Sequence, residues 1–290
     1  MADMTVEEVM DRYGPSEVRV EDILRPTDPN FEPETVALVT GAASGIGWAT
    51  ALALAANGLS VVGMDLDTEG VESVRERAEA LDAEGRIVPF EGDLLSESDC
   101  AAAVERAGEA GELRYLANVA GLQHIDDIRE YPTEQWDHIH GVMLRAPLLL
   151  TKHAWPHFEA AGGGVVGNMC SVHGHIVTGG KVAYNTAKFG LRGLTASVAA
   201  EGAGRIRSFS VSTGWVKTAL VAKQLPETAA RRGTSVEEVV RNVSLGHTRL
   251  KELLEPIEVG NLFVFGFSEH ARHLNGGDLL WDGGMKHTYA

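Results

Sequence analysis

The sequence predicts an α/β protein built on a doubly wound parallel sheet. Seven short apolar segments carry the prediction: TVALVTG, SVVGMD, RIVPFEGD, RYLANVAG, GGVVGNMCS, IRSFSVSTG and GDLLWDGG. Segments with helical periodicity lie between them, such as IGWATALALAANG and VESVRERAEALDAEG. Apolar strands that alternate with helices are typical of a parallel sheet covered by helices on both faces.

The alternation divides the chain unevenly. Residues 35–290 contain no internal repeat and no long low-complexity linker, so we expect one domain there. Residues 1–34 are an acidic N-terminal extension with four prolines. Val6, Val9, Met10 and Tyr13 have helical spacing, which fits a short docked helix. A surface extension is the favoured interpretation, because chain ends are often held by few contacts.

Composition excludes several classes of function. The net charge is −16, from 25 basic and 41 acidic residues, which argues against a nucleic-acid or acidic-membrane surface. Cys100 and Cys170 suggest neither a disulfide framework nor a metal cluster, so we expect a reducing cytoplasm. The histidines form no metal constellation either, and we expect no metal. The first residues, MADMTVEEVMDRYG, lack the features of a secretory signal, and no apolar run has the length of a membrane span.

The first chemical motif is VTGAASGIG, where a predicted strand meets a helix. Gly41, Gly45 and Gly47 permit a tight turn and close approach of the backbone to a pyrophosphate, which the N–H groups of the helix would bind. The spacing differs from the usual G-x-G-x-x-G, but its position indicates a Rossmann-type dinucleotide site. Asp65 ends the next strand, where a carboxylate could accept from a ribose 2′-hydroxyl and would repel a 2′-phosphate. We therefore expect NAD rather than NADP; the alternative for Asp65 is a solvated turn acid.

A second motif combines a serine, a tyrosine and a lysine. If VAYNTAKFGLRGLTASVAAEG is a helix, Tyr184 and Lys188 lie on one face, a turn apart. A free tyrosine has a pKa near 10, and a nearby ammonium would lower it. Ser171 ends the preceding strand and could reach the same point. Hydride transfer to or from a cofactor requires such a proton donor or acceptor at the substrate oxygen.

These motifs, with GD at 92–93, NVAG at 118–121 and TGWVKT at 213–218, resemble the short-chain dehydrogenase/reductase family over residues 35–290. The resemblance implies that Tyr184 is the general acid/base, that Lys188 lowers its pKa and holds the nicotinamide ribose, and that Ser171 hydrogen-bonds the substrate oxygen. It also implies a homotetramer. The cofactor contacts it implies are Gly41, Ser44, Gly45, Ile46, Gly47, Asp65, Asp93, Leu94, Asn118, Ala120, Gly121, Tyr184, Lys188, Val216 and Thr218.

Two positions depart from the family pattern. Met143 stands where the family usually has an asparagine that holds a water of the proton relay, and a thioether cannot take that role. Thr213-Gly214 replaces a Pro-Gly pair before the nicotinamide loop. The first departure bears on turnover, and the second on the rigidity of the loop.

Within the family, GLQHIDDIREYPTEQWD, SVHGHIVTGGKVAYNTAK and GWVKTALVAKQL are most similar to bacterial (R)-3-hydroxybutyrate dehydrogenases. The resemblance implies that a substrate carboxylate is held by polar side chains beyond Ser171 and Tyr184. These are Gln123, His173, Lys181 and Gln224, with Trp215 closing the pocket. A lysine ammonium and neutral donors suit a small anion, whose carboxylate must supply much of the affinity. His124 and His175 are interpreted as structural or surface residues.

The segment from about 217 to 256 is expected to form a helical lid that brings Gln224 onto the substrate and excludes water. Two other functions stay open. One is a short-chain dehydrogenase for another secondary alcohol or a cyclic substrate. The other is a non-catalytic dinucleotide sensor, for which Met143 is the only hint and against which Ser171, Tyr184 and Lys188 argue.

Overall fold

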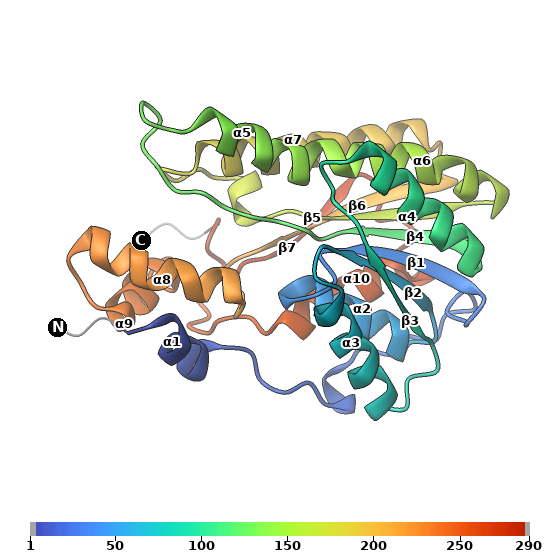
Figure 1. Cartoon of the computed structure of the whole chain (residues 1–290), viewed down its shortest axis with the longest axis horizontal. Coiled ribbons are helices and arrows are strands. Elements are labelled where there is room, and N and C mark those ends of the chain that lie inside the picture. The colour runs from blue at the N-terminus through green and yellow to red at the C-terminus, as the bar shows by residue number, and fades with distance from the viewer. Residues whose placement is uncertain (1–3, 288–290) are drawn as a thin grey trace.

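The computed structural model describes residues 4–287. A seven-stranded parallel sheet with strand order β3-β2-β1-β4-β5-β6-β7 forms its centre (Figure 1). The strands are β1 (Thr35–Thr40), β2 (Ser60–Asp65), β3 (Ile87–Glu91), β4 (Glu112–Asn118), β5 (Gly164–Met169), β6 (Ile206–Thr213) and β7 (Gly277–Trp281). Each coincides with one of the seven apolar segments of the sequence, so the predicted doubly wound α/β fold is confirmed.

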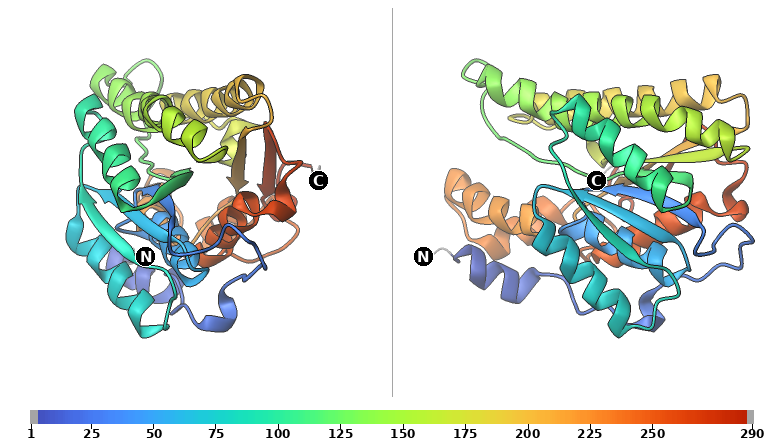
Figure 2. Two further views of the ribbon diagram at one scale, coloured as in Figure 1. Left: turned by 90° about the vertical axis from the view of Figure 1, so that its right-hand side faces the viewer. Right: turned by 45° about the vertical axis from the view of Figure 1, so that its right-hand side comes forward.

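Helices cover both faces of the sheet, as Figure 2 shows from two further sides. One layer consists of α2 (Gly45–Ala56), α3 (Thr68–Ala80) and α10 (Pro256–Phe267). The other consists of α4 (Glu97–Ala110), α6 (Ala146–Ala160) and α7 (Val182–Glu201). In β1, Val36 and Leu38 pack toward the second layer, whereas Ala37 and Val39 pack toward the first. A strand buried on both faces explains why β1 reads as a continuous apolar run.

The remaining elements connect these layers. They are α1 (Val6–Tyr13), α5 (Thr133–His140), a π-helical turn (Gly141–Arg145), α8 (Ala219–Arg232), α9 (Val236–Val239), a second π-helical turn (Val240–Ser244) and three 3₁₀ turns (Val20–Asp22, Val172–Gly174, Glu269–Ala271). In the part of the chain that is described, no helix is long and apolar enough to cross a membrane.

The strand order creates a switch point between β1 and β4. From β1 the chain continues to β2 on one side, whereas β4 continues to β5 on the other. The connections therefore diverge at the carboxyl ends of these two strands and leave a crevice, which is where open α/β sheets bind ligands. The turn after β1 and the segment after β4 approach closely there, because a Cβ on Gly41 would lie 2.8 Å from the Ala120 Cα.

The N-terminal extension contains a docked helix, so the favoured interpretation of a surface extension is wrong at α1. Thr5 caps α1 through a capping box with Glu8. Val9 is fully buried in an apolar cluster with α8 and α9, and Arg12 pairs with Glu237 at 2.6 Å. Figure 1 shows α1 beside α8 and α9 at one end of the molecule. The extension thus covers residues of the segment expected to be the lid.

Candidate active site

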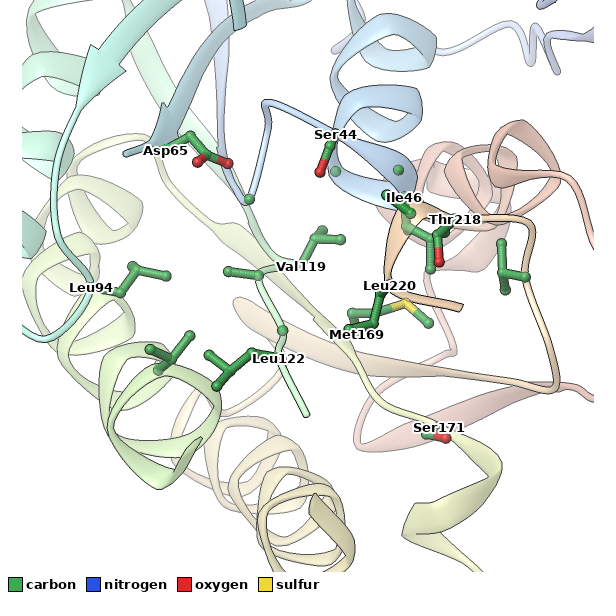
Figure 3. Close-up of a pocket in the computed structure, with 18 of the residues that line it drawn as sticks. Ser44, Ile46, Asp65, Leu94, Val119, Leu122, Met169, Ser171, Thr218 and Leu220 are labelled. Carbon is green, nitrogen blue, oxygen red and sulfur yellow. The ribbon is translucent and has the colours of Figure 1, made fainter. Parts of the chain in front are cut away.

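A pocket of about 430 Å³ opens at the switch point, and most of the residues expected to bind a cofactor line it. In Figure 3, Asp65 and Ser171 lie at opposite ends, with Ser44, Val119 and Met169 between them. The expected residues that line it are Gly41, Ser44, Gly45, Ile46, Gly47, Asp65, Asp93, Leu94, Ala120, Gly121, Ser171, Tyr184, Lys188, Val216 and Thr218. They come from the ends of β1, β2, β4, β5 and β6, from the loop after β3, and from α7.

The glycine turn is shaped for close backbone packing. Gly41 and Gly45 have positive φ angles of 69° and 55°. A Cβ on Gly47 would lie 1.9 Å from the Gly41 carbonyl oxygen, so only glycine fits there. Ser44 is the N-cap of α2 and its side chain makes no capping hydrogen bond. The first N–H groups of α2 have no partner within the helix and line a cradle for an anion.

Two acids lie at the end of the pocket that is farther from Ser171. The Asp65 carboxylate accepts from Ala43 N at 3.1 Å and from Asp67 N at 3.2 Å, which ties it to the glycine turn. The Asp93 side chain accepts from Leu95 N at 2.8 Å. Both carboxylates keep acceptor capacity toward the pocket.

Ser171, Tyr184 and Lys188 meet at the opposite end, as the sequence predicted. Ser171 ends the segment after β5 and is buried, with its hydroxyl accepting from His173 N at 3.1 Å. Lys188 is 2% exposed; its Nζ donates to the Met169 carbonyl at 2.7 Å and lies 5.4 Å from the Tyr184 ring centroid. The helix α7 places Tyr184 and Lys188 one turn apart, so the lysine faces the tyrosine ring.

Burial is the largest cause of the pKa shifts of Tyr184 and Lys188. Burial raises the pKa of Tyr184 to about 12, against an opposing hydrogen bond from Ser171. Burial also lowers the pKa of Lys188 to about 8. The pKa of Tyr184 is thus raised in this structure, whereas the sequence predicted that Lys188 would lower it, because burial outweighs every opposing effect.

Beyond Tyr184 lie three of the expected substrate residues, His173, Lys181 and Trp215. The His173 ring packs edge-on against Tyr184 with centroids 5.7 Å apart, and its Nε2 is 3.1 Å from the Thr178 hydroxyl. Burial, and then the charge of Lys181, lowers the pKa of His173 to about 4. Lys181 Nζ in turn lies 5.5 Å from the Trp215 ring centroid. His173 thus lies beside the tyrosine, and Lys181 lies beside Trp215, which precedes α8.

The two expected glutamines are less tightly placed. Gln224 is 9% exposed on α8. The Gln123 Nε2 is buried and has no partner among the described residues. Neither lines the main pocket, nor do His173, Lys181 and Trp215. A buried amide N–H without an acceptor costs folding free energy, so this group is available to donate a hydrogen bond to a ligand.

Two other expected positions have their own partners. The Asn118 side chain turns into the sheet, donates to Asn168 at 2.8 Å and does not line the pocket. Met143 is 1% exposed in the π-helical turn and packs with Ile139, Ala183 and Ala187 beside Tyr184. Its thioether fills an apolar space where the family pattern has an amide.

Comparisons with known proteins agree with this geometry. A family model described as Enoyl-(Acyl carrier protein) reductase matches residues 41–286. A D-beta-hydroxybutyrate dehydrogenase of Rhizobium meliloti is 32% identical over 86% of this chain and 97% of its own length. The chain belongs to the short-chain dehydrogenase/reductase family. A cyclohexanol dehydrogenase of Acinetobacter is 34% identical over 86% of this chain and 93% of its length, so relatives of similar identity act on different alcohols.

A solved short-chain type dehydrogenase/reductase from Mycobacterium marinum superimposes with a TM-score of 0.79. It is 24% identical, and the match covers 89% of this chain and 98% of that one, which shows the shared fold. As a short-chain dehydrogenase/reductase, the chain is an oxidoreductase that uses a nicotinamide dinucleotide.

The pocket fits such a cofactor. Gly41 and Gly47 let the turn pack closely on itself and on the segment after β4, and α2 offers N–H groups to a pyrophosphate. Asp65 offers a carboxylate that could accept from a ribose hydroxyl, and Val119, Leu94 and Ile46 supply apolar walls. When bound, the cofactor would supply the chemistry of hydride transfer, and Ser171 and Tyr184 are the candidates for moving a proton at the substrate oxygen.

Several residues that line the same pocket were not predicted from the sequence. Met169 and Cys170 directly precede Ser171 and could have been found from their place at the end of β5. Leu220 and Val221 begin α8 next to Thr218, and the strand–loop–helix pattern could have included them. His138 also lines the pocket, although nothing in its local sequence indicates it.

Proposed function

We propose that this short-chain dehydrogenase oxidises a short-chain 3-hydroxy acid with NAD, most directly (R)-3-hydroxybutyrate, to the 3-keto acid in a reversible reaction. The observation that carries the proposal is Lys181. Its ammonium is largely buried, and no carboxylate of residues 4–287 lies within ion-pairing distance. Burial lowers the pKa of Lys181 to about 8, so the cation is held at a cost that an anionic substrate would offset.

The neighbours of Lys181 favour a carboxylate over a larger anion. His173 is neutral at pH 7 and can donate one N–H, while the Trp215 ring limits the space on the other side of the ammonium. The buried Gln123 Nε2 has no partner among the described residues, and it could complete the donor set together with the Gln224 amide when α8 closes. An unpaired cation beside neutral donors suits one small carboxylate.

The opposite end of the substrate would then reach Ser171 and Tyr184. Because His173 contacts both Ser171 and Tyr184, a carboxylate near Lys181 leaves only a few carbon atoms before the reacting oxygen. In this pose the Ser171 hydroxyl donates to the substrate oxygen, and Tyr184 accepts the proton of the alcohol or returns it to the ketone. Lys188 supports the phenolate form as it develops.

Asp65 supports the choice of NAD. Its carboxylate is fixed by two backbone N–H groups at the edge of the pocket, next to the N-terminus of α2. A ribose 2′-hydroxyl can donate to that carboxylate, whereas a 2′-phosphate would be repelled by it.

The test is the appearance of reduced nicotinamide with NAD and a panel of alcohols. We expect (R)-3-hydroxybutyrate to react far faster than its (S) enantiomer, cyclohexanol or 2-butanol. Preferred turnover of cyclohexanol would replace the hydroxy-acid assignment with the cyclic-alcohol alternative. Binding of NADH without turnover of any alcohol would favour the dinucleotide sensor.

We also propose a homotetramer and a lid over about 217–256. Leu148 and Phe189 are 51% and 44% exposed on α6 and α7, and an apolar surface between those helices could pack against a second copy. Light scattering of the purified protein tests the oligomer, and a monomer at micromolar concentration would refute it.

Cys100 and Cys170 are free and buried, which agrees with a reducing compartment.

A further inference from the structure

A short turn carries both Ser171 and His173, the two residues between the sheet and the substrate. It is the 3₁₀ turn Val172–Gly174 after β5, closed by Gly174 N donating to Ser171 O at 2.8 Å and by His175 N donating to Val172 O at 2.9 Å. The direction of the Ser171 hydroxyl is therefore set by where the end of this turn is held.

The turn cannot move inward toward α7. A Cβ on Gly174 would lie 2.6 Å from the Cys170 Sγ and 3.1 Å from the Lys188 carbonyl, so the backbone already touches its neighbours. Arg192 adds a hydrogen bond to the Gly174 carbonyl at 3.0 Å. The next side chain, His175, lies on the opposite side, toward β7.

His175 is fixed from both ring nitrogens. Its Nε2 is 2.8 Å from Asp278 Oδ2 on β7, and the two side chains are only 5% and 12% exposed. The other Asp278 oxygen accepts from Ser212 at 2.8 Å and from Ser210, both on β6. Lys286 Nζ lies 3.0 Å from His175 Nδ1.

These partners select one tautomer. A lysine ammonium can only donate, so Nδ1 accepts and the ring proton resides on Nε2, which donates to Asp278. Burial lowers the pKa of His175, in agreement with a neutral ring. Each ring nitrogen has a partner of fixed polarity, and a flip of the ring would break both hydrogen bonds.

We propose that His175 is a positioning residue that, through Asp278, anchors the Ser171–His173 turn to the sheet and so aims the Ser171 hydroxyl at the substrate oxygen. No sequence pattern links His175 to Asp278, which is 103 positions away. The inference rests on the proposed role of Ser171, and it assigns a function to a buried pair that the acid–base chemistry itself does not use.

A double-mutant cycle tests it. His175→Leu keeps the bulk of the side chain and removes both hydrogen bonds, so the turn should drift and kcat should fall ten- to a hundredfold, as small misplacements in active sites do. NADH affinity should stay within twofold. In a Ser171→Ala background, His175→Leu should lower kcat less than threefold further, because the hydroxyl that His175 positions is already absent. His270→Leu, on an exposed surface, is the matched control.

Each outcome is decisive. If His175→Leu has the wild-type kcat while Ser171→Ala is impaired, the positioning role is overturned. It is also overturned if the kcat losses of the two single variants are fully additive in the double variant. A Ser171→Ala enzyme at the wild-type rate refutes the proposed role of Ser171 instead. If His175→Leu does not fold, Asp278→Asn replaces it in the same cycle, since the amide keeps the shape but has only one acceptor oxygen and cannot accept from both His175 and the two serines. The same interaction with Ser171→Ala is then required.

Discussion

Replacing Lys181 with methionine should stabilise the protein and at the same time impair its use of an acid substrate. Methionine keeps an unbranched stem that can pack on Trp215 and removes the charge. Lys181 has no anionic partner among residues 4–287, so the substitution breaks no ion pair there. The two effects have opposite signs and arise from the same buried ammonium.

The gain in stability follows from the pKa. Burial lowers the pKa of Lys181 from 10.5 to about 8, and one pKa unit corresponds to about 1.36 kcal/mol. The unfolded chain therefore binds this proton more tightly than the folded protein. The buried ammonium therefore lowers the free energy of unfolding by its full amount below pH 8, and this loss disappears as the pH rises from 8 to 10.5. Allowing for solvent near the ammonium, Lys181→Met should gain about 1–3 kcal/mol at pH 7 and little at pH 10.5.

The loss in activity follows from the missing contact. A hydrogen bond to a charged group contributes roughly 1.5–3 kcal/mol, so kcat/KM for (R)-3-hydroxybutyrate should fall about ten- to a hundredfold. The methyl ester carries no charge at that end and should lose less than threefold. Lys223→Met removes an exposed lysine of α8 and should change neither quantity.

Urea unfolding of the cofactor-free protein and steady-state kinetics on the acid and its ester measure both effects. A destabilised Lys181→Met protein would mean that the ammonium has a stabilising partner. Equal losses on acid and ester would mean that Lys181 supports the fold or the cofactor and does not bind a carboxylate.

Four further outcomes are expected. The kcat/KM for the acid, but not for the ester, should fall above pH 8 as free Lys181 loses its proton, and a parallel decline for both substrates would contradict this. Tyr184→Phe should lower kcat about 100-fold or more with NADH binding unchanged in fluorescence titration, whereas near-wild-type turnover would remove the tyrosine from the mechanism. Asp65→Ala should narrow the preference for NAD over NADP, and a wild-type enzyme that is faster with NADP would refute the assignment. Val9→Ala should cost about 2 kcal/mol of unfolding free energy, whereas Val6→Ala on the 40% exposed face of α1 should cost under about 0.5, and equal costs would disprove the docking.

The sheet could be predicted because its central strands, such as β1 and β5, are buried on both faces and therefore read as apolar runs. The alternation with amphipathic or apolar helices then fixed the class of fold, and the glycine turn located the switch point. Local patterns also placed the candidate catalytic residues. The end of a strand located Ser171, and the helix periodicity located Tyr184 and Lys188.

Other features depend on contacts between distant segments. The periodicity of Val6–Tyr13 indicated a helix, but the surface that buries Val9 belongs to α8 and α9, more than 200 residues away. The π-helical turn at Met143 is a backbone adjustment that no side-chain pattern encodes. Lys181 reads as a solvated lysine in isolation, and only the fold places it against Trp215 and lowers its pKa.

The most direct test of the central claim is the ratio of kcat/KM for (R)-3-hydroxybutyrate to that for its methyl ester, measured on the unmodified protein with NAD at pH 7. If the buried ammonium of Lys181 receives the substrate carboxylate, the acid should be preferred by at least about tenfold, the lower bound for one charge-assisted hydrogen bond. An ester that reacts as well as the acid, or better, would contradict carboxylate recognition at this site.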